Sequence, residues 1–269
     1  MTEIATAPVA VVLGDRSRLP GLRNLMRKDT GEWLHGSRPW AVMIATTIIL
    51  LLTAANGRLA EWASRVASEH GAAVALPSLV PLDNLLMAVG TQAVVFAAIG
   101  ATMSVLVAER ERGTLAWTAS KPVSRTSILV SKWISWTFML WLTAVVVPLV
   151  ATTALVTVLY GAPDAGTVLV LGCGLAAVPA LFVAISLAAS TVVSSTAAVA
   201  SIGVAALVAS TMLGGLVPAI VPVLPTSIFS WVVVVATGGP LSLVTPIAWS
   251  LGVTLLLALG RYRLERMEL

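Results

Sequence analysis

The segment ERERGTLAWTASKPVSRTSILVSK, residues 109–132, determines how the rest of the chain must be arranged. It carries seven ionised side chains, whereas long stretches on both sides of it carry none. One charge at the centre of a membrane-spanning helix costs roughly 2.5–3.5 kcal/mol, so burying all seven in lipid would cost on the order of 20 kcal/mol. We therefore expect this charged loop to lie in water between two spans, where a soluble partner can contact it.

The composition is typical of a polytopic membrane protein. Of the 269 residues, 58% are hydrophobic and 10% are charged, and the mean hydropathy is +0.98. Soluble domains carry about 25% charged residues. Six apolar stretches are interpreted as transmembrane helices, each of which needs about 20 residues. They cover residues 40–55, 85–108, 133–160, 167–189, 197–217 and 241–262. The predicted fold is an all-α membrane protein with six spans.

The distribution of basic residues predicts the orientation in the membrane. All lysines and arginines except Arg58 and Arg65 fall in the N-terminal segment, the charged loop or the C-terminal tail. Cytoplasmic loops carry an excess of lysine and arginine, so both termini and the charged loop are expected in the cytoplasm. Because the basic residues gather beside spans and form no basic domain, the net charge of +4 does not indicate nucleic-acid binding.

Two further segments have a predicted relation to the membrane surface. Residues 1–38 are expected to form a cytoplasmic N-terminal segment, followed by a transmembrane domain at 39–269. Within the N-terminal segment, apolar residues recur at helical spacing opposite basic ones, which indicates an amphipathic helix in the inner interface. These apolar residues are Leu22, Leu25, Met26 and Trp33. Gly31 or Gly36 would permit the bend into the first span.

Residues 218–240 form the second of these segments. Their apolar run, 228–236, is too short to cross a bilayer, and Pro218, Pro222 and Pro225 interrupt any helix before it. We expect a re-entrant or interfacial hairpin on the outer side, between the last two spans.

The sequence lacks the residues of an autonomous catalyst or pump. It has no G-x-x-x-x-G-K-[ST] loop, so the chain is not expected to bind a nucleotide by itself, and no catalytic or metal-binding residue is assigned. His35 and His70 lie on opposite predicted sides of the membrane, and Cys173 is the single cysteine. Between residues 133 and 260 the only charged side chain is Asp164, whereas ion-coupled carriers usually need charged groups within the membrane. The energy for any transport must come from elsewhere.

Local signals within the charged loop predict a short helix across the ends of two spans. Gly113 provides a break after the second span, and Thr114 is expected to cap a helix over 115–120. Leu115, Ala116 and Trp117 of this helix would face a partner. Pro122 would end it, and Ser124 would then cap the third span.

These residues resemble a known family. Glu111-Arg112-Gly113-Thr114-Leu115, followed by Pro122-Val123-Ser124-Arg125 and Lys132, is similar to the cytoplasmic loop of ABC-2-type transporter permeases. The resemblance implies that a separate ABC ATPase, carrying ATP and magnesium, binds the short helix as a coupling helix at about 114–120. It also implies a second permease subunit, identical or similar. The implied ATPase-coupling residues are Glu109, Glu111, Arg112, Gly113, Thr114, Leu115, Trp117, Pro122 and Arg125.

The resemblance further implies a substrate path between the second and fifth spans. The candidates to line it share one face of the second span and are Gln92, Phe96, Ile99 and Met103. The expected function is that of a non-enzymatic permease subunit in a bacterial plasma-membrane exporter, moving an apolar or amphipathic drug, lipid or metabolite. Two alternatives stay open: a secondary carrier driven by an ion gradient, and a non-transporting scaffold that anchors a soluble partner.

Overall fold

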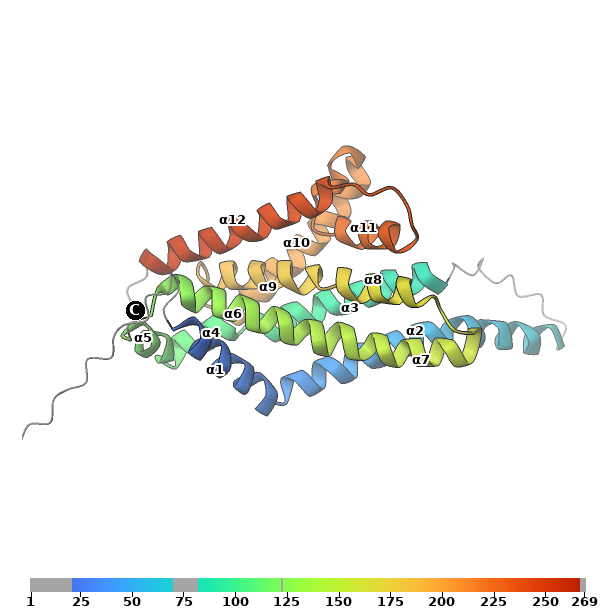
Figure 1. Cartoon of the computed structure of the whole chain (residues 1–269), viewed down its shortest axis with the longest axis horizontal. Coiled ribbons are helices and arrows are strands. Elements are labelled where there is room, and N and C mark those ends of the chain that lie inside the picture. Colours follow the sequence, from blue (N-terminus) through green and yellow to red (C-terminus); the bar gives the residue numbers. More distant parts are fainter. Residues whose placement is uncertain (1–20, 70–81, 122, 267–269) are drawn as a thin grey trace, which may run out of the picture.

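The computed structural model describes residues 21–69, 82–121 and 123–266, and within them it contains helices and turns but no strand. Six helical stretches are long and apolar enough to cross a membrane, and each overlaps one of the six predicted spans. They are Arg38–Glu69, Gly90–Glu111, Arg125–Tyr160, Ala165–Ser190, Thr196–Leu216 and Val244–Arg266. Most of them run along the long axis of the molecule (Figure 1). The predicted all-α polytopic fold is confirmed.

Three of the spans are interrupted helices. The second span consists of α3 (Leu82–Thr102) and α4 (Val105–Glu111). The third consists of α6 (Arg125–Leu140), a π-helical segment (Trp141–Val146) and α7 (Val147–Tyr160). The fourth consists of α8 (Ala165–Gly174) and α9 (Ala177–Ser190). A proline has no N–H group and clashes with the carbonyl four residues earlier. Pro148 explains the π-helical segment before it, and Pro179 explains the break after α8.

The core is built around α9, which packs against α3, α6, α10 (Thr196–Leu216) and α12 (Val244–Arg266). Phe182, Val183 and Ala184 of α9 have no exposed surface. The indole N–H groups of two tryptophans satisfy carbonyls on either side of the break before α9. Trp133 donates to Ala180 and Trp141 to Gly172, each at 2.8 Å. These bonds attach the fourth span to the third.

The segment between the last two spans contains a 3₁₀ helix, Pro218–Val223, and one short helix, α11 (Ser227–Ala236). Val232 of α11 is buried and lies where a side chain at Gly174 of α8 would have to fit. The backbone N–H of Thr226 donates to Ser210 Oγ of α10 at 3.0 Å. The hairpin is therefore packed into the bundle, and its position relative to a lipid bilayer remains a prediction.

The N-terminal helix is α1 (Leu22–His35), and it turns into α2 (Arg38–Glu69) at Gly36. Gly31, the alternative bend, lies within α1. The apolar face of α1 packs on α6, where the rings of Trp33 and Trp136 meet edge to face with centroids 4.7 Å apart. The helix expected to lie in the interface is thus held by protein along that face. At its other end α2 continues beyond the predicted end at residue 55.

Candidate functional site

The charged loop lies at the end of the bundle where α1 begins and α12 ends (Figure 1). Its short helix, α5 (Thr114–Ala119), follows α4 after a tight turn and precedes α6. Arg125, the first residue of α6, donates a hydrogen bond from Nη1 to the carbonyl oxygen of Leu264 near the end of α12. The ends of α1, α4, α6 and α12 therefore lie around the charged loop, and Arg125 joins α6 to α12 there.

Gly113 forms the turn between α4 and α5. Its φ of +69° lies in the left-handed region that favours glycine, and its N–H donates to the carbonyl of Arg110 at 3.1 Å. Thr114 is the first residue of α5, and its hydroxyl donates backward to the carbonyl of Glu109 at 3.1 Å. The expectation that Thr114 caps α5 is therefore wrong: Gly113 occupies that position, and the threonine closes the turn instead.

The short helix presents a mixed surface. Trp117 is 63% exposed, and the ammonium group of Lys121 lies 3.4 Å from its ring centroid in a cation–π contact. Leu115 is only 2% exposed and packs into the core. The expectation that Leu115 faces a partner is therefore corrected, because its side chain anchors α5 to the bundle. Ala116 and Trp117 remain on the open side of α5.

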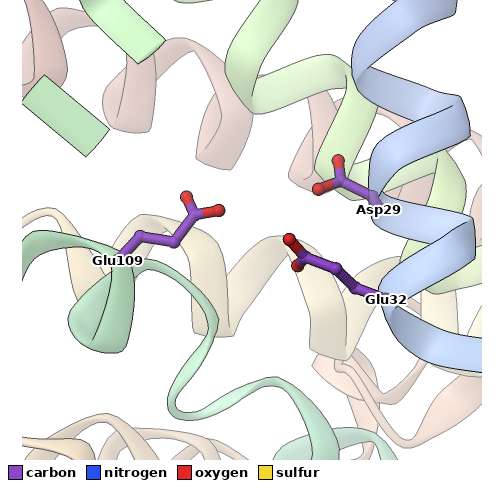
Figure 2. A group of neighbouring side chains, drawn as sticks. All are labelled: Asp29, Glu32 and Glu109. Carbon is purple, nitrogen blue, oxygen red and sulfur yellow. The ribbon is translucent and has the colours of Figure 1, made fainter. Parts of the chain in front are cut away.

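A network of ion pairs joins α1, α4 and α6 beside the charged loop. The ammonium group of Lys132 lies 3.2 Å from Asp29 Oδ1 and 2.9 Å from Glu109 Oε1. Lys28 approaches the same Glu109 oxygen at 3.3 Å and Glu32 Oε1 at 3.6 Å. Figure 2 shows the Glu109 carboxylate pointing across a gap toward Asp29 and Glu32 on α1. Because Asp29 and Lys132 are 3% and 4% exposed, this network fixes α1 and α4 to the base of α6.

Burial and neighbouring charges shift the pKa values of two residues in this network, Asp29 and Lys28. Burial raises the pKa of Asp29 above its ordinary value, although the ammonium of Lys132 opposes the shift. For Lys28, burial acts to lower the pKa, but the carboxylates of Glu109 and Glu32 outweigh it and raise the pKa.

Oxygens of Asp29, Glu32 and Glu109 lie within 4.8 Å of one another, a spacing that suits a cation. In this arrangement the lysine ammonium groups supply the positive charge.

The remaining predicted coupling residues occupy the surface of this region. Glu111 and Arg112 are exposed at the end of α4. Ser124 caps α6 as predicted, since its hydroxyl accepts a hydrogen bond from the N–H of Ser127 at 3.0 Å. Pro122 lies outside the described residues.

A cavity of about 480 Å³ opens beside the ion-pair network, between α1, the start of α2, α4 and α6.

The four candidates for a substrate path do not form one exposed face. Gln92 and Phe96 are exposed on α3, whereas Ile99 is buried against Gly203 of α10. Met103 is half-buried and packs on a small apolar cluster at the turn between α3 and α4. Within this chain, the packing of Ile99 closes that part of the predicted path.

Gln92 lines a second cavity of about 510 Å³ between α3, α10 and α11. The described residues that line it carry hydroxyl groups, and none of them has an ionised side chain. These hydroxyl groups belong to Thr91, Ser210, Thr211, Thr226, Ser227 and Ser230.

Sequence reasoning did not identify the part that α1 plays in the site. Asp29 falls on the apolar side of α1, spaced seven residues from Leu22 and four from Leu25 and Trp33. A carboxylate among apolar residues at helical spacing needs a buried cation, and this pattern could have identified it.

Comparison with known proteins gives one family. Residues 23–269 match the family described as "ABC-2 family transporter protein". The match covers every helix that the structure describes except the first residue of α1. No curated protein matches the chain.

Proposed function

The chain belongs to the ABC-2 transporter family, and from this membership we propose that it is the permease subunit of an ATP-driven exporter of the bacterial plasma membrane. Family membership makes it a multi-pass membrane subunit of an ABC transporter. The finer proposal is that a separate ATPase, carrying ATP and magnesium, docks on α5. A second permease subunit would complete the transport path.

One observation carries the docking proposal: α5 combines an exposed aromatic anchor with a rigid attachment. Trp117 is exposed on α5 beside Lys121, and tryptophan is one of the residue types enriched at the energetic centre of protein interfaces. Beneath it, Leu115 is buried and α4 is tied by Glu109 to Lys132 of α6. A partner that moves Trp117 would therefore pull on the second and third spans together.

The cavity between α3, α10 and α11 supports the proposed class of substrate. Its hydroxyl groups and the amide of Gln92 offer hydrogen bonds, and the described residues that line it include no ionised group, which disfavours a charged solute. An uncharged amphipathic molecule fits this lining. The exposed apolar faces of α10 and α12 suit contact with lipid or with a second permease subunit.

The test compares two tryptophans with equal exposure on elements at opposite ends of the helix bundle (Figure 1). Trp117 on α5 and Trp62 on α2 are both 63% exposed. The tagged full-length chain is purified from its native membranes, and the amount of ATPase that co-purifies with it is measured. We expect Trp117→Ala to lower the amount of bound ATPase about tenfold or more, the loss of a typical interface anchor. Trp62→Ala should leave it unchanged.

Two results would contradict the proposal. If Trp117→Ala retains the ATPase as well as the unmodified chain does, α5 is not its docking element. If the purified chain moves solute in ATP-free vesicles on an ion gradient alone, the chain acts as a secondary carrier.

A further inference from the structure

The 480 Å³ cavity beside the ion-pair network has a chemical character of its own. It lies at the elbow between α1 and α2, and α4 and α6 form its other walls. Charged side chains and two tryptophans line it. Glu109 and Lys132 hold α4 to α6 in the proposed coupling, and the open space beside them has no part in it.

The cavity offers unneutralised positive charge. Among the residues that the structure describes, the side chains of Arg38 and Arg112 form no ion pair, although both line the cavity. Lys132, in contrast, is already held by two carboxylates. Guanidinium groups bind phosphate through paired N–H donors, and two of them beside one cavity favour an anion of that shape.

A buried donor adds to this preference. Trp33, 3% exposed, lines the cavity, and its Nε1–H has no hydrogen-bond partner within the described part of the chain. An unpaired buried N–H costs free energy that an acceptor in the cavity would recover. At the exposed edge of the cavity, Glu32 is held by Lys28 only at 3.6 Å. The open edge of the cavity therefore carries two arginines and Glu32, while the Glu109 and Lys132 side chains that line it deeper are paired with each other.

The cavity also lies where lipid headgroups are found. Arg38 is the first residue of the first span, Arg112 follows the last residue of the second, and Lys132 is in the second turn of the third. Residues at the ends of three spans lie at the boundary between hydrocarbon and water. Basic pockets between spans on the cytoplasmic side bind phosphate-bearing headgroups.

We propose that this cavity binds the headgroup of an aminophospholipid. Arg38, Arg112 and the Trp33 N–H hold the phosphate, and Glu32 pairs with the ammonium group. The bound headgroup fills the elbow between α1 and α2.

The test uses native mass spectrometry of the purified full-length chain in detergent. Three lipids with identical acyl chains are titrated: phosphatidylethanolamine, phosphatidylglycerol and diacylglycerol. We expect phosphatidylethanolamine to be retained best and diacylglycerol least. Arg38→Gln together with Arg112→Gln should weaken retention of both phospholipids by about thirtyfold, the effect of losing two cations near a lipid surface. Glu32→Gln should remove only the preference for phosphatidylethanolamine.

The matched control removes two arginines from the same end of the molecule. Arg261→Gln with Arg263→Gln makes the same change of net charge on α12, outside the cavity lining. An equal loss of lipid in this control would overturn the proposal, because general attraction between charges would explain the binding. Equal retention of diacylglycerol would also overturn it. Displacement of the lipid by millimolar inorganic phosphate would also overturn the proposal, because the cavity would then be a binding site for free phosphate. The comparison of lipids on the unmodified chain decides the matter even if a variant fails to fold.

Discussion

At the scale of single residues, Lys132 has an unusual position for a charged side chain in a membrane protein. Its ammonium group is buried between carboxylates from two other helices, at 3.2 Å from Asp29 and 2.9 Å from Glu109. The desolvation of buried charges offsets much of their attraction, so the pairs need not add net stability. Removing one partner is different, because it leaves the opposite charge buried without compensation.

We therefore predict that Lys132→Met lowers the free energy of unfolding by about 3–5 kcal/mol, the usual penalty for breaking a buried pair. Chemical unfolding of the detergent-solubilised chain, followed by circular dichroism, measures this loss. Adding Asp29→Asn to Lys132→Met should recover part of it, since it removes one uncompensated charge.

The matched control is Arg261→Gln, which breaks the exposed pair with Glu265 on α12. Exposed pairs contribute about 0–1 kcal/mol, so this variant should unfold close to the unmodified chain. Lys132→Met behaving like Arg261→Gln would show that the buried network does not form.

At the scale of elements, the turn between α4 and α5 decides how the coupling helix is presented. Gly113 allows the chain to reverse within one residue because its φ is +69°. Apart from its chain neighbours, no atom of the described residues lies within 4 Å of a Cβ added here, so the cost of a side chain is one of backbone conformation. Gly238, which follows α11 at the hairpin, shares both properties with a φ of +72°.

This pair of glycines gives a matched prediction. Gly113→Ala and Gly238→Ala should each destabilise the chain by about 1–2 kcal/mol, because an L-residue is disfavoured in the left-handed region. Only Gly113→Ala should also lower the ATP hydrolysis of the complex purified with the ATPase, because only that turn positions α5. Equal effects of the two variants on ATP hydrolysis would mean that the geometry of the α4–α5 turn is not used in coupling.

At the scale of the whole molecule, the chain has two chemically different ends. One end gathers the charged loop, the ion-pair network and the basic end of α12. At the other, Arg58 of α2 donates from Nη2 to the carbonyl of Leu159 at 2.6 Å and stacks on the Tyr160 ring. The 32 residues of α2 extend about 48 Å, so this helix is longer than the roughly 30 Å of hydrocarbon that a span must cross.

The proposed orientation predicts which end is accessible from outside the cell. In a Cys173→Ser background, Trp62→Cys should react with a membrane-impermeant maleimide on intact cells. Trp117→Cys should react only after the membrane is opened. Both tryptophans are equally exposed in the folded chain, so a difference in labelling reports the side of the membrane. The reverse pattern would place the charged loop outside and exclude a cytoplasmic ATPase at α5.

The sequence alone determined the number of spans, the position of the charged loop and the cap at Ser124. Each follows from a quantity that is read along the chain: the cost of placing about 20 successive residues in lipid, or a hydrogen bond between residues three apart. The family match over residues 23–269 agrees with the resemblance drawn from the charged loop.

Only the tertiary structure decided which face of each helix is buried. Leu115 is buried whereas Trp117 is exposed. Asp29 pairs with Lys132, which lies 103 residues later in the sequence. A helix can rotate about its own axis at little cost in lipid, where apolar side chains are equally well accommodated on every face. Its rotation is therefore set by packing against neighbours distant in the sequence, and the ion-pair network and the cavity beside it exist only once those neighbours are in place.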